Sequence, residues 1–426
     1  MEVNLDKVSI RPLAPSDADY LLKWLSNPAV LEFYEGRDFQ CTMEAVQEHF
    51  YASEPWMSRW IVTYNRGPVG YLQSYPVVGE MRTEYGFEGP EEAVYAIDQF
   101  IGEPEMWGRG IGRSFLRLIL RWLEREKGAE VVLLDPHTDN ARAIRSYLAV
   151  GFQAIKLLPA HELYEGMMRD CWLMAYYPDG RRLPGGIVPL SGNRNLRELG
   201  GIQNREGTAI RPGLLYRGGA LDGLSAADCE YLYRLGIRSV VDLRTEEESR
   251  RAPDSLKGFR DVLVYPFPLL DGVFVPGEGE VTDGLPGMYC AMLDGLTSQP
   301  MIAELFRKLP ELLEEGGALF HCTAGKDRTG VISMLLLELF GAEDRVIVEN
   351  YSRSQELLED PLKIQWRLER DYRRILPLSF FQSAPENAEA FLRHLREKYG
   401  SARGYLRNAG LKDEEIGRLV GMMGQD

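Results

Sequence analysis

The 426-residue sequence is poor in cysteine and histidine and has no long apolar run. Its five cysteines are scattered, with no CxxC pair or Cys/His cluster, which argues against disulfides and structural zinc. The five histidines are isolated from one another, so no metal site is expected. No apolar stretch approaches the roughly 18 residues of a membrane span, and the acidic start lacks the features of a signal peptide. We therefore expect a cytoplasmic protein with no integral membrane segment.

Positive charge is also in short supply. The chain has 49 Lys and Arg against 64 Asp and Glu, for a formal net charge of −15. This balance would repel nucleic acid and anionic membranes, and it would attract a cationic small substrate. On charge alone, simple solubility is the better explanation. The composition, 45% hydrophobic and 27% charged, is that of a globular protein.

The length and one composition shift predict two domains. At about 150 residues per domain, the chain suggests two or three. Residues 177–186, YPDGRRLPGG, contain two prolines and three glycines, which break helices and strands alike. We predict one domain over residues 1–177, a linker over 178–189 and a second domain over 190–426.

Both halves show α/β patterns. In the first, strands are predicted at residues 94–101, 131–134, 152–158 and 171–176, with a long amphipathic helix ending at Lys127 and another near 140–150. In the second, residues 239–243 and 318–320 form buried strands, and 318–320 leads through a glycine loop into an apolar helix over 331–340. A strand, loop and helix in this order direct backbone N–H groups at an anion.

The first half contains a glycine-rich turn, WGRGIGR, at residues 107–113. Alternating glycines let the backbone approach a ligand closely, and the following helix offers its N-terminal dipole to a pyrophosphate. Taken alone, the turn is equally typical of a tight strand-to-helix connection. About thirty residues later comes a second set of positions, at Asn140, Ala143, Tyr147, Gly151 and Phe152.

Together, the two segments resemble the signature regions of the GNAT N-acetyltransferase superfamily. Four runs resemble aminoglycoside 6′-N-acetyltransferases, and most of all the acetyltransferase half of the bifunctional acetyltransferase–kinase resistance enzyme: VLEFYEGRD (30–38), GYLQSY (70–75), IDQFIGEP (97–104) and LDPH (134–137). The loop departs from the superfamily at its first position, where Trp107 replaces the usual Gln or Arg.

This resemblance implies a mixed-sheet acyltransferase domain that uses acetyl-CoA, bound through Arg109, Gly110, Ile111, Gly112, Arg113 and Asn140. It also implies Asp98 as the base that deprotonates the amine and Tyr147 as the acid for the CoA thiolate. Asp135 would help to bind a polycationic sugar. An acidic group near the amine suits the chemistry, because an ammonium must lose a proton before it attacks a thioester.

The most specific motif in the chain is HCTAGKDRTG at residues 321–330. It places Cys322 and Arg328 six positions apart around a glycine loop. The loop N–H groups and the helix dipole would favour a Cys322 thiolate, and Arg328 offers a planar fork to two phosphate oxygens. Thiolate attack on phosphorus would give a phosphocysteine that water then cleaves.

This loop resembles that of the protein tyrosine phosphatase superfamily, in a bacterial branch of tyrosine and phosphoinositide phosphatases. NLRELGG (195–201), LYRGGAL (215–221) and VDLRTEEE (241–248) match further segments of the branch, as do YGS (399–401) and YL (405–406). The resemblance implies an α/β fold in which Thr323, Ala324 and Gly325 bind the phosphate. Asp327 is the leading general acid and Asp242 the second. Lys326 would suit a second phosphate on the substrate or would simply be solvated.

The working hypothesis is a bifunctional enzyme that acetylates an aminoglycoside, as in antibiotic resistance, and hydrolyses phosphotyrosine or a phosphoinositide without a metal. Two alternatives stay open. The first domain could acetylate another, housekeeping amine, or it could be an inactive ligand sensor that regulates the phosphatase.

Overall fold

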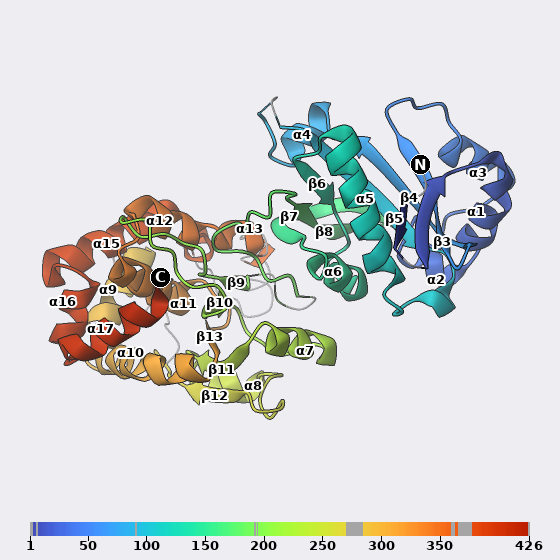
Figure 1. Cartoon of the computed structure of the whole chain (residues 1–426). Helices are drawn as coiled ribbons and strands as arrows, with labels where there is room; N and C mark the ends of the chain where they lie inside the picture. The colour runs from blue at the N-terminus through green and yellow to red at the C-terminus, as the bar shows by residue number, and fades with distance from the viewer. Residues whose placement is uncertain are drawn as a thin grey trace. The chain divides into compact units, whose positions relative to one another are not determined.

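The structure is a computed structural model of the chain, and it describes residues 3–5, 7–89, 92–190, 193, 195–269, 284–358, 363–364 and 377–424. The chain divides into two compact units, Met1–Arg182 and Leu183–Asp426 (Figure 1). Within the described residues, no helix has both the length and the apolar character that crossing a membrane requires.

The division falls inside the segment that the sequence predicts as a linker. Before it, the Arg181 carbonyl accepts a hydrogen bond from Gln153 in the first unit, at 2.9 Å. After it, the Gly185 N–H donates to Gly200 at 3.0 Å and the Val188 N–H to Leu196 at 2.9 Å, both in the second unit. The second half of residues 178–189 is therefore packed chain that belongs to the second unit.

The first unit is built on an eight-stranded sheet of order β1-β2-β3-β4-β5-β6-β8-β7. All neighbours are antiparallel except β5 and β6. The strands are β1 (Val3–Leu5), β2 (Val8–Pro12), β3 (Ser58–Tyr64), β4 (Gly67–Pro76), β5 (Val94–Ile101), β6 (Val131–Leu134), β7 (Gln153–Tyr164) and β8 (Met167–Tyr176).

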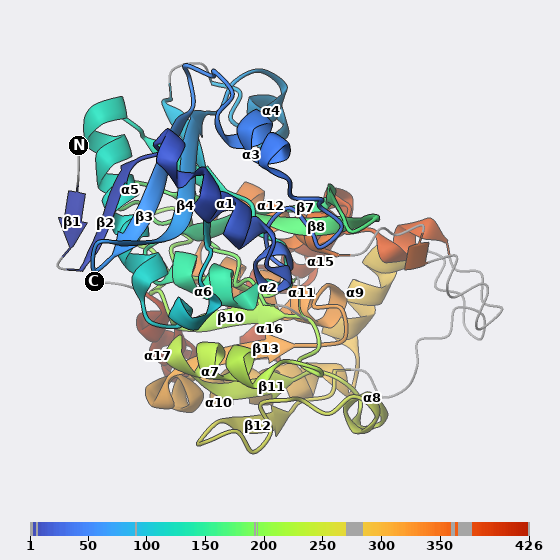
Figure 2. The ribbon, with the colours of Figure 1, turned by 90° about the vertical axis from the view of Figure 1, so that its right-hand side faces the viewer.

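Helices cover both faces of this sheet because successive strand residues point to opposite sides. Trp60 of β3 packs against Trp122 of α5 (Ile111–Lys127), with ring centroids 4.9 Å apart, and Figure 2 shows α5 beside β2. The next residue, Ile61, packs with the helices of the other face. Those helices are α1 (Ala18–Leu25), α2 (Pro28–Leu31) and α3 (Met43–Phe50); the unit also has α4 (Gly79–Glu84) and α6 (Ala141–Leu148).

The sheet opens between β5 and β6. Their parallel pairing runs only from Val94 to Ala96 on β5, whereas β4 stays paired with β5 as far as Ile101. Beyond Ala96, β5 therefore has a sheet partner on one side only. Asp98 and Gln99 lie in this half-paired stretch, and Asp135 follows the end of β6. The opening brings the polar side chains of these two strands to one place.

The second unit has a five-stranded sheet of order β12-β11-β13-β10-β9. Four strands are parallel and β9 is antiparallel to β10. Their bounds are β9 (Arg197–Glu198), β10 (Leu215–Gly218), β11 (Ile237–Asp242), β12 (Leu263–Pro266) and β13 (Gly317–His321).

The core of this unit surrounds α11 (Asp327–Phe340), a helix that is apolar on all sides. Only Asp327, Arg328 and Glu338 escape burial along it, as expected of a helix enclosed by other elements. Its neighbours include β10 and β13. The other helices among the described residues of this unit are α7 (Ala226–Arg234), α8 (Glu246–Arg251), α9 (Gly284–Asp294), α10 (Ser298–Glu315), α12 (Asp344–Ser352), α13 (Ser354–Leu357), α15 (Pro385–Tyr399), α16 (Ala402–Asn408) and α17 (Asp413–Met423), with a 3-10 turn at Leu378–Phe381.

Candidate active sites

The Cys322 loop leaves the sheet at the carboxyl ends of its parallel strands. Gly218 of β10 and Asp242 of β11 both pair with His321, the last residue of β13. The chain segments that follow these three strands therefore emerge side by side, which is where open α/β sheets bind their ligands. Cys322 is buried, with 3% of its surface exposed.

Hydrogen bonds from outside the loop hold its carbonyl groups. The Thr323 carbonyl accepts from the Ala220 N–H, the Ala324 carbonyl from the Asn195 amide and the Gly325 carbonyl from the Arg217 guanidinium, each at 2.9 Å. In a trans peptide the N–H points away from the carbonyl. Three outward carbonyls thus turn the next three N–H groups toward the inside of the loop. Gly325 is required here, because its φ is +70° and a Cβ would lie 2.4 Å from the Gly218 backbone.

Arg328 is oriented by Glu248 of α8. Its two terminal nitrogens each bond one Glu248 oxygen at 2.7 Å. The same carboxylate accepts from the Thr245 N–H at 2.9 Å and the Thr323 hydroxyl at 2.6 Å. Burial opposes ionisation of Glu248, but Arg328 and Thr323 outweigh it and hold the pKa of this carboxyl well below its usual range. Glu248 thus fixes the plane of the Arg328 guanidinium beside the loop.

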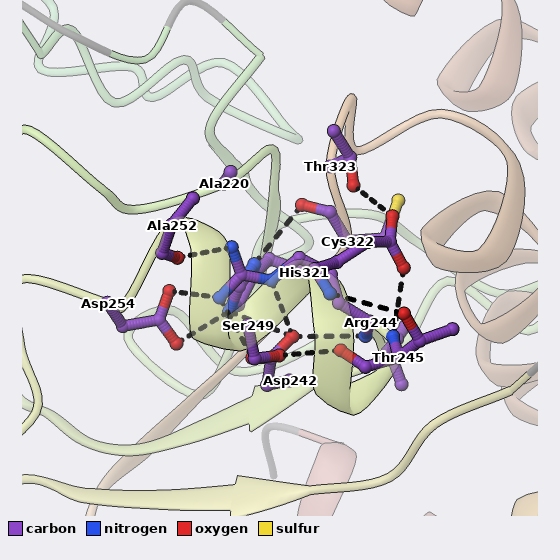
Figure 3. Close-up of polar contacts among 12 residues, drawn as sticks. Ala220, Asp242, Arg244, Thr245, Ser249, Ala252, Asp254, His321, Cys322 and Thr323 are labelled. Carbon is purple, nitrogen blue, oxygen red and sulfur yellow. Dashed lines mark hydrogen bonds and ion pairs between the residues drawn. The ribbon is translucent and has the colours of Figure 1, made fainter.

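A buried charge network lies behind the loop (Figure 3). Arg244 bonds both oxygens of Asp242 at 2.8 Å and one of Asp254 at 2.9 Å. His321 lies between the loop and this network, 3.2 Å from both the Cys322 carbonyl and Asp254. Burial opposes ionisation of Asp242, yet Arg244 holds its pKa below the usual range. An ionised carboxylate bonded in this way is poorly suited to donate a proton to a leaving group.

Asp327 begins α11 and is only partly buried. One carboxylate oxygen accepts from the buried Tyr289 hydroxyl at 2.6 Å, and Tyr289 in turn bonds Tyr351 at 2.7 Å. The neighbouring Lys326 is 3% exposed, and its ammonium donates to the carbonyls of Phe380 and Gln382 at 2.5 and 3.3 Å. The structure therefore places the Lys326 ammonium under the Leu378–Phe381 turn and 3.5 Å from the Asp327 carboxylate.

In the first unit, Asp98 lies in the opening between β5 and β6. It accepts from the Gln73 amide at 2.7 Å and from the Tyr75 hydroxyl at 3.5 Å. Burial is the main influence on this carboxyl, and repulsion from Asp135 adds to it. Together they raise its pKa to about 6, against the opposing hydrogen bonds. A carboxylate with this pKa is ionised at neutral pH and can still accept a proton.

Tyr147 of α6 reaches the same opening and is 9% exposed. The Gln99 amide donates to its hydroxyl oxygen at 2.6 Å, which leaves the hydroxyl proton available for another acceptor. Burial raises the pKa of Tyr147 far above neutrality. The hydroxyl therefore stays protonated at neutral pH and gives up its proton only to a strongly basic group.

Carboxylates are concentrated around this opening. Asp135 accepts from the Tyr85 hydroxyl at 2.6 Å and lies 3.1 Å from His161, and these bonds hold its pKa below the usual range although burial opposes ionisation. Burial and the nearby Glu162 raise the pKa of Glu35. Glu162 bonds His137 at 2.7 Å. The surroundings are negative, which suits a cationic ligand.

The predicted acetyl-CoA loop precedes α5. Gly110 has φ +81° and forms the N-cap without a side-chain hydrogen bond, so the helix begins at the loop with backbone N–H groups that have no partner within the helix. Arg109 and Arg113 are exposed. Asn140 caps α6 by accepting from the Ala143 N–H at 3.2 Å. Trp107, the unusual residue of the loop, bonds the Ile101 carbonyl at 2.9 Å, and the Arg142 guanidinium stacks 3.7 Å from its ring centroid.

Two clusters of potential metal ligands occur among the described residues. Asp242, Asp254 and His321 form one, but Arg244 already provides the cation between the two carboxylates. His137, Glu162 and Cys171 form the other. Burial and the neighbouring carboxylates raise the pKa of the Cys171 thiol, so this sulfur stays protonated in the structure as it stands. Neither cluster is an evident cation site.

Both units match families of known proteins. A model described as tyrosine phosphatase family matches residues 188–424, more than half of the chain. The triple specificity protein phosphatase PtpB of Mycobacterium tuberculosis is 31% identical over 273 residues, covering 54% of this chain and 99% of that protein. The chain belongs to the tyrosine phosphatase family.

Outside this tyrosine phosphatase domain, an acetyltransferase (GNAT) domain model matches residues 14–159. The aminoglycoside N(6′)-acetyltransferase type 1 of Klebsiella pneumoniae is 28% identical over 151 residues, covering 35% of this chain and 75% of that protein. A solved structure of AAC(6′)-Ib with ribostamycin and coenzyme A is 24% identical, with a TM-score of 0.35, covering 41% of this chain and 96% of that one. The predicted pairing of the two families, their α/β fold class and the two enzyme classes are confirmed.

The structure gathers the residues predicted for each site. Asp98, Tyr147 and Asp135 border the β5–β6 opening, and Cys322, Arg328 and Asp327 surround one loop of the tyrosine phosphatase domain. Sequence reasoning missed the residues that hold these groups: Gln73, Gln99 and His161 in the first unit, and Asn195, Arg217, Glu248 and Tyr289 in the second. Five of these residues lie in segments quoted for the two family resemblances, which were the only signal that could have found them: Gln73, Gln99, Asn195, Arg217 and Glu248.

Proposed function

We propose that the chain is a bifunctional enzyme. Its first domain, over residues 1–177, transfers the acetyl group of acetyl-CoA to the 6′-amine of an aminoglycoside. Its second, over 190–426, hydrolyses phosphate monoesters through Cys322. The observation that supports this best is the joint placement of a complete acid–base pair at one site and of a cysteine–arginine loop at the other.

In the acetyltransferase reaction, Asp98 removes a proton from the substrate ammonium. The free amine attacks the thioester carbonyl, the carbon–sulfur bond breaks, and Tyr147 donates its proton to the departing thiolate. The attacking nitrogen then loses its second proton, which restores the Tyr147 hydroxyl. The pKa of Asp98, raised to about 6 by burial, suits the first step near neutral pH. Arg109, Arg113 and the N–H groups of the loop would bind the pyrophosphate, together with Asn140.

Three findings support an aminoglycoside as the amine. Segments distinctive of 6′-acetyltransferases run through residues 30–137. A relative is named for this activity. The opening is surrounded by the carboxylates Glu35, Asp98, Asp135 and Glu162, as a polycationic sugar requires. Resistance to such antibiotics would follow, in the cytoplasm, where acetyl-CoA is available.

In the phosphatase reaction, the Cys322 thiolate attacks phosphorus while Asp327 protonates the leaving oxygen. Water then cleaves the phosphocysteine, with Asp327 taking the proton. The inward N–H groups after Thr323, Ala324 and Gly325 bind the equatorial oxygens with Arg328. We favour Asp327 over Asp242 because Asp242 is bonded to Arg244 behind the loop. The chemistry requires no metal. Phosphotyrosine and phosphoinositides are the proposed substrates.

The test is direct. The purified chain is incubated with acetyl-CoA and kanamycin, tobramycin or amikacin, and separately with phosphotyrosine peptides and phosphoinositides. Mass spectrometry should detect one added acetyl group, and phosphate release should continue in EDTA. Acetylation of other amines alone would overturn the aminoglycoside assignment and leave the acetyltransferase. No acetylation of any amine would favour a sensor domain.

A further inference from the structure

Two arginines lie buried beneath the Cys322 loop with neutral partners only. Arg197 of β9 and Arg217 of β10 are both 0% exposed. Arg217 donates to the Asn350 side-chain carbonyl at 2.8 Å and to the Gly325 carbonyl at 2.9 Å. Arg197 donates to the Asn350 backbone carbonyl at 2.7 Å and to the Ser354 hydroxyl at 2.9 Å, and also to Asn195. Neither forms an ion pair with a carboxylate among the described residues.

Burying an unpaired charge is costly, and proteins normally pair it or neutralise it. Burial is the main influence on Arg217 and lowers its pKa to about 10, and burial together with repulsion from Arg217 lowers the pKa of Arg197. A group with a pKa near 10 remains charged at neutral pH. The fold therefore keeps a positive charge that the described carboxylates do not neutralise.

The anion that this charge faces is in the loop. Arg217 bonds the loop carbonyl of Gly325, and its strongest favourable charge interaction is with Cys322 when the thiol is ionised. Asp327 contributes a weaker one. Coulomb attraction acts strongly through a buried region, so a fixed positive charge bonded to the loop attracts an anion that forms or binds there.

We propose that Arg217 is a positioning residue of the phosphatase reaction: it holds the Gly325 carbonyl outward and supplies, from beneath the loop, an unneutralised positive charge that stabilises the Cys322 thiolate. The inference rests on the proposed role of Cys322 as nucleophile. It separates two contributions of one side chain, a hydrogen bond that shapes the loop and a charge that acts on the sulfur.

Asn350→Asp distinguishes these contributions in the full-length protein. The new carboxylate can accept the same hydrogen bond from Arg217, so the loop keeps its support, but it neutralises the guanidinium. The measurement is the rate of Cys322 alkylation by iodoacetamide from pH 4 to 9, with Cys322→Ser as the blank. We expect the pH of half-maximal alkylation to rise by about one unit, and kcat/KM at acidic pH to fall about tenfold.

The matched control is Asn204→Asp, which adds the same charge to the same unit. Asn204 accepts from the Glu206 and Thr208 N–H groups, bonds that an aspartate preserves. It lies beside Gly341 at the far end of α11, about 20 Å along the helix from the loop. Alkylation in this variant should follow the wild-type pH profile. An Asn350→Asp profile equal to that of Asn204→Asp would overturn the proposal.

A second pair of variants decides the matter if Asn350→Asp does not fold. Arg217→Lys keeps the charge and Arg217→Gln removes it, and both shorten the side chain, so both weaken or lose the hydrogen bond to the Gly325 carbonyl. The proposal expects a higher alkylation midpoint only in Arg217→Gln; equal midpoints would overturn it. If the proposed function itself is wrong, wild-type Cys322 will alkylate like an ordinary thiol, and Cys322→Ser will retain whatever turnover the wild type has. Failure of the Arg217 proposal alone would leave both of these properties of Cys322 intact.

Discussion

The two candidate sites are built alike but with charges of opposite sign. Each has one charged group with a charged partner, Asp135 with His161 in the first unit and Arg328 with Glu248 in the second. Each also has a buried charged group held only by neutral hydrogen bonds, Asp98 in the first and Arg217 in the second, where Arg197 is a further example. In each site the charge of the unneutralised group is opposite to that of the proposed substrate. The negative Asp98 faces an amine cation, and the positive Arg217 faces a phosphate anion.

The comparison also shows why the two unneutralised groups cannot do the same work. Burial raises the pKa of Asp98 to about 6, close enough to neutrality for it to exchange a proton during turnover. Burial lowers the pKa of Arg217 only to about 10, so the guanidinium stays charged throughout. A buried carboxylate can therefore act as a base, whereas a buried arginine supplies a permanent positive charge. In the proposed phosphatase reaction the chemistry is accordingly assigned to Cys322 and Asp327.

The largest expected effect tests the nucleophile of the phosphatase site. Cys322→Ser should lower kcat for every phosphate ester on the order of 10⁴–10⁶-fold, because a serine hydroxyl is far less ionised than a thiol at neutral pH and a covalent nucleophile is lost. Acetylation by the same variant is the internal control and should be unchanged. Steady-state phosphate release measures the first and mass spectrometry the second. Turnover of any ester at the wild-type rate would exclude the cysteine mechanism.

The next effect tests Asp98 as a base. Asp98→Asn should lower kcat/KM for acetyl transfer about 10²–10⁴-fold, with acetyl-CoA binding little changed because the loop before α5 is intact. In the wild type, kcat/KM should fall below pH about 6, where a carboxylate with the raised pKa becomes protonated. Asp135→Asn is the matched control, since it should raise KM for the amine more than it lowers kcat. Full activity of Asp98→Asn would remove Asp98 from the mechanism.

The sequence predicted a structural element correctly where the residues of that element form a clear pattern by themselves. Residues 94–101 and 131–134 were predicted as strands with the bounds that the structure has, because each is a compact β-rich run. The strand predicted to end at Leu158 instead runs to Tyr164, across a register irregularity between Leu158 and Glu162. That polar extension brings His161 and Glu162 to the carboxylate-lined opening, and no local pattern announces it.

The buried arginines were beyond sequence reasoning for a different reason. Arginine is rarely fully buried without a partner, so Arg197 and Arg217 give no sign of their position in the sequence itself. Their burial depends on β9 and β10 pairing with each other and on α12 and α13 covering them. The HCTAGKDRTG motif identified the loop, but the residues that shape it come from chain segments more than 70 positions away.

A smaller effect sharpens the choice of general acid. Asp327→Asn should slow alkyl phosphates about 10²–10³-fold, within the range of a lost acid, and slow aryl phosphates with good leaving groups much less, since these need no proton. Tyr289→Phe removes the 2.6 Å hydrogen bond to Asp327 and should show the same leaving-group bias, several-fold in size. The measurement is kcat/KM against leaving-group pKa. An equal loss on both ester types would point away from Asp327.

The smallest expected effect tests whether the two sites work independently. Fragments 1–182 and 183–426 should each fold, the first acetylating and the second hydrolysing phosphate esters, with kcat/KM within about twofold of the full chain, because domains joined by a Pro/Gly-rich segment generally fold alone.

The cut must fall at Arg182/Leu183. Starting at Pro189 would remove the hydrogen bonds of Gly185 to Gly200 and of Val188 to Leu196, and with them the edge beside β9, which supports Arg197. A fragment from Pro189 should therefore be less stable than one from Leu183 in thermal melts. Loss of activity in fragment 183–426, with the full chain active, would show that the phosphatase site depends on the acetyltransferase domain. The two sites could then not be treated as independent.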